Sequence, residues 1–512
     1  MLVKTYGSAC YGVKAITITV EVDVSPGLGF LMVGLPDNAV KESQQRISTA
    51  VQSIGLKMPG RKVVINMAPA DIRKEGSAYD LPLAIGILAA SGQIDASRLE
   101  QYVLMGELSL DGYLRPIAGA LPIAIQARSE AFAGFILPKE NAREAAVVNK
   151  LDVYGMETLQ DVIDFFNGAR SFEPLVFNTR EEFAGNPANY DVDFSDVKGQ
   201  ENVKRALEIA AAGGHNMIMI GPPGAGKTML AKRLPTILPP LSLQEALETT
   251  KIHSVAGKLG KNAGLISCRP FRSPHHTISN VGLVGGGTNP QPGEISLAHN
   301  GVLFLDELPE FQRTVLEVMR QPLEDRQITV ARAKYSVDYP ANFMLVASMN
   351  PCPCGNYNHP DKKCLCPPGT VQKYLSRISG PLLDRIDIHI EITPVPFAKL
   401  ADMLPTESST TVRERVIGAR QVQKQRFAAE EGIYNNAMMS SRLLKKYCVL
   451  DSPCQILLKQ AMERMGLSAR AYDRILKVAR TIADLAQQDA IHPNHLAEAI
   501  QYRSLDREGW AG

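Results

Sequence analysis

Eight consecutive residues, GPPGAGKT at positions 221–228, constrain the fold of this chain more than any other stretch. They fit the pattern G-x-x-x-x-G-K-[ST], which forms a phosphate-binding loop where a strand precedes it and a helix follows it. The apolar run MIMI ends just before the motif, and the helix-compatible run MLAKR comes after it. The glycines let backbone N–H groups surround a polyphosphate, and the helix adds its positive N-terminal end. The sequence therefore predicts a nucleoside triphosphate site formed by Gly221, Pro222, Pro223, Gly224, Ala225, Gly226, Lys227 and Thr228.

Five side chains have predicted tasks in the chemistry of this site. Lys227 would reach the β- and γ-phosphates, and the hydroxyl of Thr228 would bind Mg²⁺. The later stretch GVLFLDEL is an apolar strand that ends in two acids, of which Asp306 would complete the Mg²⁺ shell. The second acid, Glu307, would orient and polarise the attacking water. A third apolar strand leads to Asn350, whose amide could position the same water or could simply occupy a turn. ATP and Mg²⁺ are thus the predicted cofactors.

Composition excludes some classes of protein and leaves others open. The 512 residues are too many for one core, so two to four domains are expected. Lys and Arg together number 55 and Asp and Glu 53, so bulk charge neither requires nor excludes nucleic acid. No apolar run approaches the roughly 20 residues of a membrane span, and the first residues lack the apolar core of a signal peptide. The expected location is the cytoplasm, without a membrane partner.

Changes in residue pattern divide the chain into four parts. Residues 1–172 are predicted to form an α/β domain, in which 15–24 alternates apolar and polar residues as a strand does. Residues 173–190 lose this periodicity and are predicted to be a linker. Residues 191–400 form a second α/β domain with the phosphate loop. Residues 401–512 are almost wholly helical in pattern.

Three longer segments resemble the magnesium-chelatase-like branch of the AAA+ ATPases. They are DFSDVKGQENVKRALEIAAAGGHNMIMIGPPGAGKT, RPFRSPHHTISNVGLVGGGTNPQPGEISLAHNGVLFLDELPEF and YLSRISGPLLDRIDIHIEI, and the likeness continues through SARAYDRILKVARTIADL. Across nearly the full length the chain is similar to the competence-protein ComM and YifB family. The resemblance implies a doubly wound parallel sheet, Asn350 as sensor 1, Arg385 as the arginine finger, and Arg470 as the sensor 2 arginine of a helical lid. It also implies a homo-oligomeric ring, most simply a hexamer, because a finger acts on a neighbouring subunit's nucleotide. Each arginine could instead be a surface ion-pair residue.

Two insertions in the second domain bear on what such a ring would act on. The stretch DRQITVARAKYSVDYP is predicted to form two short strands around a turn that carries Arg332 and Lys334. It resembles the pre-sensor 1 hairpin of chelatase-like AAA+ proteins, and residues 282–293 resemble their helix 2 insert. A cationic hairpin tip in a ring pore can hold the phosphates of single-stranded or branched DNA. The alternative is a solvated hairpin with incidental charge.

Four of the eight cysteines lie close together in the sequence. Cys352, Cys354, Cys364 and Cys366 form CPCGNYNHPDKKCLC directly after the predicted sensor 1 residue. Four thiolates in one loop could bind a structural Zn²⁺ ion, with His359 as an alternative ligand. The cysteines could also be reduced loop residues or a redox pair. Zinc is favoured because a long polar loop has little else to order it.

The N-terminal domain resembles the Lon protease domain, an α/β fold related to ribosomal protein S5. The likeness lies in RKEGSAYDLPLAIGILAASG and GELSLDGYLRPIAGALPIAIQARSEAFAGFILPKENARE. That fold uses a Ser nucleophile activated by a Lys. The aligned positions are Ala78 and Pro122, which supply neither group, and Ser77 next door lacks the matching lysine. Proteolysis is therefore not expected. A similarly disarmed Lon-like domain occurs in RadA-type recombination ATPases.

These features favour an ATP-hydrolysing ring that moves DNA and promotes branch migration. The resemblance to the ComM and YifB family implies a helicase that promotes integration of incoming DNA during natural transformation. The alternative is the ATPase subunit of a magnesium-chelatase-type metal-insertion complex. Against it stand the Lon-like domain and the lack of a visible porphyrin-handling region. An ATP-dependent protease is disfavoured by the missing dyad. A scaffold that binds ATP without hydrolysing it is disfavoured by Glu307, Asn350 and Arg385.

Overall fold

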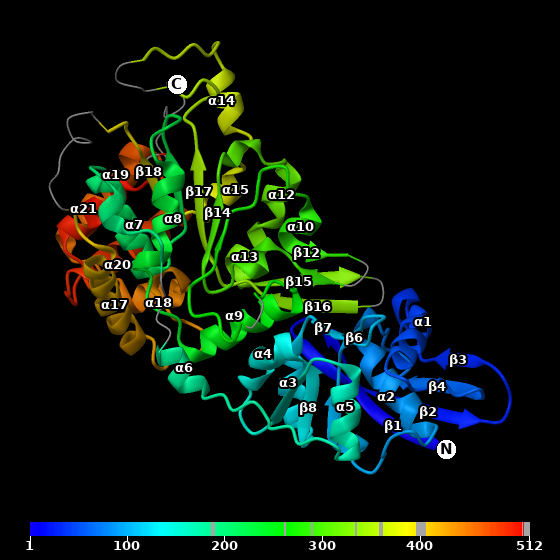
Figure 1. Cartoon of the computed structure of the whole chain (residues 1–512). Coiled ribbons are helices and arrows are strands. Elements are labelled where there is room, and N and C mark those ends of the chain that lie inside the picture. The colour runs from blue at the N-terminus through cyan, green and yellow to red at the C-terminus, as the bar shows by residue number, and fades with distance from the viewer. Residues whose placement is uncertain are drawn as a thin grey trace.

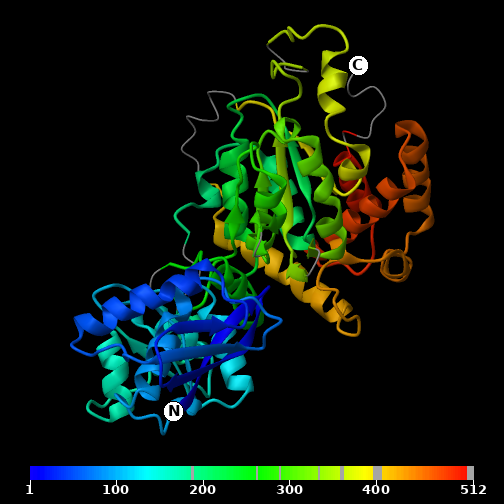
Figure 2. The same ribbon diagram turned by 90° about the vertical axis from the view of Figure 1, so that its right-hand side faces the viewer.

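The computed structural model describes residues 1–185, 190–260, 263–287, 290–332, 335–357, 362–395, 406–503 and 505. Figure 1 shows an N-terminal α/β unit, a central α/β unit and a group of C-terminal helices. In both views the C-terminal helices lie beside the central sheet, and the N-terminal unit lies below the central unit (Figures 1 and 2). Among the described residues, no helix combines the length and the apolar character that crossing a membrane would need.

A mixed sheet organises the N-terminal unit. Its strands are β1 (Leu2–Tyr11), β2 (Lys14–Ser25), β3 (Phe30–Val33), β4 (Lys62–Ala68), β5 (Tyr102–Leu104), β8 (Gly134–Pro138) and β9 (Asp152–Met156). They lie in the order β3-β4-β2-β1-β5-β8-β9, with β2 antiparallel to both β1 and β4 and the other neighbours parallel. The short strands β6 (Glu107–Leu108) and β7 (Leu114–Arg115) pair separately. The strand expected from alternation at 15–24 is present as β2, whose Ile18, Val20 and Val22 are fully buried.

Helices pack on this sheet and connect it to the rest of the chain. They are α1 (Asn38–Ser53), α2 (Asp80–Ala90), α3 (Ala120–Ser129), α4 (Ala142–Ala146), α5 (Leu159–Asn167) and α6 (Thr179–Gly185). Every residue of α2 is buried, because this helix is apolar on all sides except for Asp80. Asp80 is paired with the Arg46 guanidinium of α1 at 2.7 Å. The segment 173–190, expected to be a linker, contains α6, and the Thr179 hydroxyl there donates to the Val147 carbonyl.

The central unit is built on a five-stranded parallel sheet. Its strands are β10 (Met217–Ile220), β11 (Phe271–Arg272), β14 (Val302–Leu305), β17 (Met344–Met349) and β18 (Ile388–Glu391). They lie in the order β11-β14-β17-β10-β18. The strands β10, β14 and β17 are buried along their whole length, which explains why they are apolar except for Ser348 of β17. The strand order reverses at β10, and in open α/β sheets ligands bind at the carboxyl ends of the strands beside such a point.

Helices and small hairpins fill the connections of this sheet. The helices are α7 (Glu201–Gly213), α8 (Lys227–Ile237), α9 (Leu243–Val255), α10 (Asn280–Val284), α11 (Glu294–Leu297), α12 (Arg313–Val318), α13 (Arg320–Asp325), α14 (Thr370–Leu375) and α15 (Gly380–Leu383). The hairpins are β12 (Gly285–Gly286) with β13 (Gln291–Pro292), and β15 (Gln327–Arg332) with β16 (Tyr335–Pro340). The two strands expected between Arg326 and Pro340 are therefore present.

The C-terminal part is helical, as its sequence predicts. Its helices are α17 (Ser409–Arg426), α18 (Ser441–Tyr447), α19 (Ser452–Met465), α20 (Ala469–Leu485) and α21 (Pro493–Gln501). Their apolar faces share one buried cluster with α7, α8 and one face of the central sheet. The most buried polar link between α17 and α20 joins the Arg426 guanidinium to Asp484 at 2.5 Å. Shared burial of this kind makes the helices part of the core of the central unit.

A second polar network attaches α20 to the central sheet. His215, just before β10, contacts Asp387 through Nδ1 at 2.9 Å and Thr481 of α20 through Nε2 at 2.8 Å. The Arg474 guanidinium of α20 lies 3.0 Å from Asp387. Burial alone would raise the pKa of Asp387, but Arg474 and His215 hold it well below its usual range. The carboxylate therefore stays ionised inside the protein and fixes α20 to the amino ends of β10 and β18.

The N-terminal unit contacts the central unit at two places. At the first, the Gly119 N–H donates to the Ser254 carbonyl at 3.0 Å, and the Ser254 hydroxyl donates to the buried carboxyl of Glu144. Burial raises the pKa of Glu144. At the second, the turn between β1 and β2 rests on β16. A Cβ atom at Gly12 would lie 2.5 Å from the Val337 side chain, so only glycine fits this close approach.

Candidate nucleotide site

The phosphate loop joins the carboxyl end of β10 to the start of α8, as the sequence predicts. Gly224 and Gly226 have φ angles of 78° and 84°, a left-handed conformation that glycine adopts without strain. Gly221 has no room for a side chain, because a Cβ atom there would lie 2.6 Å from the Ile392 carbonyl oxygen. The helix α8 begins at Lys227 and directs its positive end toward the loop. This is the arrangement that binds a polyphosphate.

Lys227 lies among oxygen acceptors at the base of this loop. Its ammonium group donates to the carbonyls of Gly221 at 2.7 Å and Pro222 at 3.0 Å. It also donates to Oδ1 of Asn350 at 3.0 Å. Burial lowers the pKa of Lys227, and the neighbouring carboxylates oppose that shift. The structure therefore brings the predicted sensor 1 residue, at the end of β17, into contact with the phosphate-loop lysine.

The first of the two acids is held by hydroxyl groups from two sides. The Thr228 hydroxyl donates to Oδ2 of Asp306 at 2.7 Å. The Ser348 hydroxyl, on the adjacent strand β17, donates to the other carboxylate oxygen. The hydroxyl and carboxylate oxygens of Thr228 and Asp306 are the hard ligands that Mg²⁺ prefers beside a phosphate. Ser348 was missed by sequence reasoning, although it stands two residues before Asn350.

The second acid is positioned by an unusual backbone conformation. Glu307 has a φ angle of 53°, a left-handed value that is strained for a side chain of this size. Such strain is often kept at functional sites. The carboxylate is 54% exposed, and its Oε2 lies 3.6 Å from Nδ1 of His276. His276 follows β11 and stacks against His275, with ring centroids 4.0 Å apart. No role was predicted for this histidine pair from the sequence.

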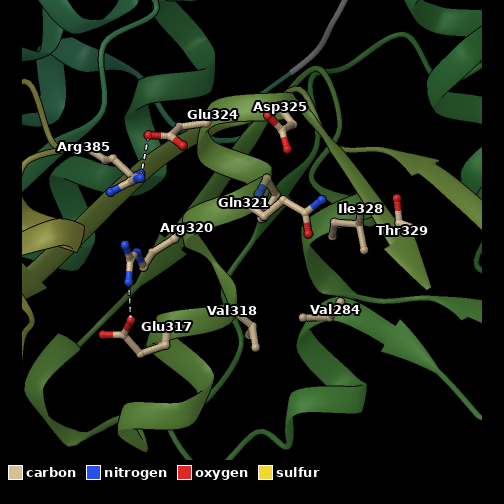
Figure 3. Close-up of a pocket in the computed structure, with 11 residues that line it drawn as sticks. Val284, Glu317, Val318, Arg320, Gln321, Glu324, Asp325, Ile328, Thr329 and Arg385 are labelled. Carbon is tan, nitrogen blue, oxygen red and sulfur yellow. Dashed lines mark hydrogen bonds and ion pairs between the residues drawn. The ribbon is translucent and has the colours of Figure 1, made fainter. Parts of the chain in front are cut away.

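The two predicted arginines lie together, but not beside the phosphate loop of their own chain. The Arg385 guanidinium is 11% exposed and pairs with Glu324 of α13 at 2.5 Å. The Arg470 guanidinium, 67% exposed, pairs with Asp384 at 2.7 Å. Figure 3 shows the Arg385 pair at the edge of a surface hollow of about 580 Å³, which also holds an ion pair between Arg320 and Glu317. Both predicted arginines are thus engaged by carboxylates within one chain.

Strand direction shows how far these arginines are from the phosphate loop. The side-chain amide of Asn216, just before β10, donates to the Arg385 carbonyl, and the Asn216 carbonyl accepts from the Asp387 N–H. Arg385 therefore lies at the amino ends of β10 and β18. The phosphate loop leaves the carboxyl end of β10, beside Ile392. Five residue steps at about 3.3 Å each separate the two ends by about 16 Å. An arginine at the amino end cannot reach the phosphates held at the carboxyl end of the same chain.

The four clustered cysteines come together after Asn350. Their sulfur atoms all lie within 4.8 Å of one another, and the Sγ distances from Cys352 to Cys354 and Cys364 are 3.3 and 3.8 Å. Four sulfurs bound to a tetrahedral Zn²⁺ at 2.3 Å would be about 3.8 Å apart, so this donor set fits the ion. The N–H groups of Asn356 and Leu365 lower the pKa of Cys354 to about 6, which favours a thiolate. His359, the alternative ligand, lies outside the described residues.

The remaining predicted residues are placed as follows. Arg332 ends β15, but its side chain and the whole of Lys334 lie outside the described part of the chain. In the N-terminal unit the Gly106 N–H donates to the Ala78 carbonyl, and Pro122 is buried within α3. The Ser77 hydroxyl donates to the Glu107 carboxylate. A serine bound to a carboxylate, without an amine base, gives no basis for the Lon-type reaction.

Family comparisons agree with this architecture along the chain. Family models described as "Magnesium chelatase, subunit ChlI", "Subunit ChlI of Mg-chelatase" and "Magnesium chelatase, subunit ChlI C-terminal" match residues 193–400, 20–141 and 406–503. Competence protein ComM of Haemophilus influenzae is 46% identical over 99% of this chain and 98% of its own length. The chain belongs to the ComM/YifB family. YifB of Salmonella typhimurium is 47% identical over 98% of this chain and 96% of its own length.

Membership of this family confirms the fold expected from the sequence. This chain combines a magnesium-chelatase-like AAA+ unit with an N-terminal α/β unit and C-terminal helices. Lon protease 2 of Bacillus subtilis is 33% identical over 157 residues, 28% of this chain and 27% of that protein. This partial match supports the Lon-like character of the N-terminal unit. ATP and Mg²⁺ are consistent with the family, and the four-cysteine cluster is consistent with a zinc site.

Proposed function

We propose that this ComM/YifB protein is a ring-forming ATPase that uses ATP hydrolysis to move DNA. Its expected place is the cytoplasm, and its expected reaction is branch migration of recombination intermediates, which promotes integration of incoming DNA. In each subunit Lys227 and Thr228 bind the triphosphate, Asp306 completes the Mg²⁺ shell, and Glu307 and Asn350 position the attacking water. When bound, Mg²⁺ neutralises charge on the phosphates. The proposal keeps the predicted domain boundaries, with a Lon-like domain at 1–172, a linker at 173–190, the AAA+ core at 191–400 and the helical lid at 401–512.

The proposal that the subunits form a ring rests on the separation of the two arginines from the phosphate loop of their own chain. Arg385 and Arg470 lie on one surface at the amino ends of the strands, and the nucleotide site lies at the carboxyl ends. A guanidinium that stabilises charge on the transferred phosphoryl group must then come from a neighbouring subunit. Such head-to-tail contacts generate a closed ring when the rotation between neighbouring subunits closes. We expect a hexamer, in which Arg385 leaves Glu324 to reach the adjacent nucleotide.

Three observations support DNA as the substrate that the ring moves. The β15–β16 hairpin projects from the central unit; Arg332 ends β15, and Lys334 follows it in the sequence before β16. A ring would multiply these cationic groups around its pore, where they can bind a phosphate backbone. The relative with 46% identity is named a competence protein, and competence is the uptake of DNA. The Lon-like unit retains its fold without Ser-Lys chemistry, so the work is not proteolysis.

The four cysteines bind a structural zinc ion in this proposal. Their sulfur geometry fits tetrahedral coordination by four cysteines. The ion would order the loop between Asn350 and α14 without taking part in hydrolysis.

A second candidate is the ATPase subunit of a magnesium-chelatase-type complex. Family models that carry the name of that subunit match the N-terminal, central and C-terminal parts of the chain. The match at residues 20–141 removes the argument that the N-terminal unit by itself excludes a chelatase role. The near full-length identity to a competence protein still favours DNA.

ATPase and junction assays separate the two candidates. Phosphate release is measured with and without DNA, and branch migration is followed on a fluorescently labelled four-way junction. We expect DNA to stimulate hydrolysis and the junction to be resolved only with ATP, with Lys227→Ala inactive in both assays. Hydrolysis that ignores single-stranded, duplex and branched DNA alike, without junction processing, overturns the DNA motor and favours the chelatase-type role.

A further inference from the structure

The four-cysteine loop lies directly against the phosphate loop. Gly355, between Cys354 and the rest of the loop, has a φ angle of 78°, and a Cβ atom there would lie 2.5 Å from Cδ of Pro223 and 3.1 Å from its Cγ. The backbone at Gly355 therefore touches the proline ring of the phosphate loop without intervening side-chain atoms. The Gly355 N–H donates to the Cys352 carbonyl at 2.9 Å. This hydrogen bond closes a turn from Cys352 to Gly355, which contains two of the four cysteines.

The cysteine loop has little apolar burial of its own to keep this turn in place. Cys352 is fully buried, but the other three cysteines are only partly buried. Leu365, between Cys364 and Cys366, leaves 80% of its surface exposed. The sulfur cluster joins the turn at 352–354 to the segment at 364–366. A metal ion bound to all four thiolates would connect these segments where apolar packing does not.

We propose that the metal at the four cysteines braces the phosphate loop, so that metal occupancy sets the affinity for nucleotide. The thiolate set takes Zn²⁺. The metal-bound turn holds the Gly355 backbone against Pro223, and Lys227 contacts Asn350, two residues before Cys352. One wall of the phosphate loop and one of its polar contacts therefore come from the segment that the metal orders. This inference rests on the nucleotide site of the proposed function, but not on DNA as the substrate.

Loss of the metal should weaken nucleotide binding. If the ordered loop becomes a minority conformation, the apparent Kd rises in inverse proportion to its population, and a population of one tenth gives a rise of about tenfold. The measurement is the Kd of a fluorescent ATP analogue in the presence of Mg²⁺ and without DNA. It is made on the full chain as purified, after removal of zinc by a thiol-directed chelator, and after reloading with Zn²⁺. Zinc content is measured by atomic absorption on each sample.

Two glycine variants test the contact itself. Gly355→Ala places a methyl group against Pro223, whereas Gly369→Ala has nearly the same backbone strain, φ 75°, with nothing within 4 Å of its Cβ. We expect both variants to keep one zinc per chain and only Gly355→Ala to raise the Kd. In a third variant, Pro223→Ala, the ring that meets Gly355 is removed, so zinc removal should change the Kd far less than in the wild type.

The outcomes of these tests are distinct. A zinc-dependent Kd that is lost in Pro223→Ala supports the brace. A chain that neither contains nor takes up zinc, or a stripped chain that binds nucleotide with unchanged affinity, overturns it. Equal nucleotide affinity in Gly355→Ala and Gly369→Ala also overturns it. Failure of junction processing with a zinc-dependent Kd intact would remove the DNA motor and leave the brace standing.

Discussion

A mixture of two inactive variants tests whether each nucleotide site is completed by a neighbouring subunit. Glu307→Gln removes the group that orients water, and Arg385→Ala removes the guanidinium at the opposite end of the sheet. Loss of an arginine finger slows phosphoryl transfer by about 10³- to 10⁵-fold. At about 1.4 kcal/mol for each factor of ten, this raises the barrier by roughly 4 to 7 kcal/mol. Each variant alone should therefore show almost no ATPase activity.

The structure predicts how much activity the mixture regains. If the site uses Glu307 from one subunit and Arg385 from the next, an intact site forms only where the two variants are adjacent in one order. Random assembly of equal amounts gives that order at about a quarter of the head-to-tail interfaces. After subunit exchange, phosphate release should rise to about a quarter of the wild-type rate if the sites act independently.

A matched mixture provides the control. Lys227 and Glu307 both lie at the carboxyl end of the sheet in the same chain, so Lys227→Ala mixed with Glu307→Gln leaves no interface intact. Subunit exchange is verified with labelled chains in both mixtures. Full exchange of Arg385→Ala with Glu307→Gln without recovery of activity refutes the argument from strand direction. Recovery in the Lys227 mixture refutes it equally, because the site would then not be divided as described.

Three further substitutions have defined outcomes. Glu324→Gln should raise steady-state ATPase by up to about fivefold, since it removes one ion pair, with Glu324 itself 55% exposed, that is worth about 1 kcal/mol; Glu317→Gln, in the same hollow, should leave the rate unchanged. His276→Ala should lower kcat about tenfold without changing nucleotide Kd, because the imidazole lies near Glu307 rather than at the phosphate loop; an unchanged kcat contradicts this role. Asp387→Ala should lower the free energy of unfolding by about 3 to 5 kcal/mol at pH 7, since it leaves the Arg474 guanidinium and the buried His215 ring without their shared partner. The folded pKa of that carboxyl is depressed, so its contribution is full above about pH 4 and lost as the pH falls further; a gap between variant and wild type that does not shrink in acid argues against it.

The parts of the site that were predictable are those encoded by adjacent residues. The phosphate loop and the acidic pair each lie in one continuous stretch, where a buried strand leads directly into the functional side chains. Local pattern is enough in such cases, because the strand and the turn that follows it determine where the side chains point. The strand at 15–24 and the hairpin at 326–340 were predictable for the same reason.

The contacts that were missed depend on which strands are neighbours. Ser348 reaches Asp306 because β17 pairs with β14, and periodicity does not reveal strand order. His276 reaches Glu307 from the loop after β11, which lies on the other side of β14. The resemblance to AAA+ proteins suggested roles for Arg385 and Arg470. Only the parallel register of β10 and β18 shows that Arg385 lies at the opposite end of the strands from its own phosphate loop, and these strand ends are about 16 Å apart.

The contact between Gly12 and Val337 has a consequence for the mechanics of the ring. The turn at Gly12 continues into β1 and β2, the longest paired strands of the N-terminal sheet, and Val337 belongs to the strand that returns from the hairpin tip. A paired sheet is stiff along its strands, so a displacement of β16 at Val337, in the half of the hairpin nearer its turn, would be passed to the whole N-terminal unit as one body. The N-terminal unit, which resembles a protease without its catalytic dyad, would then act as an inert mass attached to the hairpin. In the proposed hexameric ring, six such masses would resist sideways motion of the hairpins, so that each proposed step would be directed along the pore.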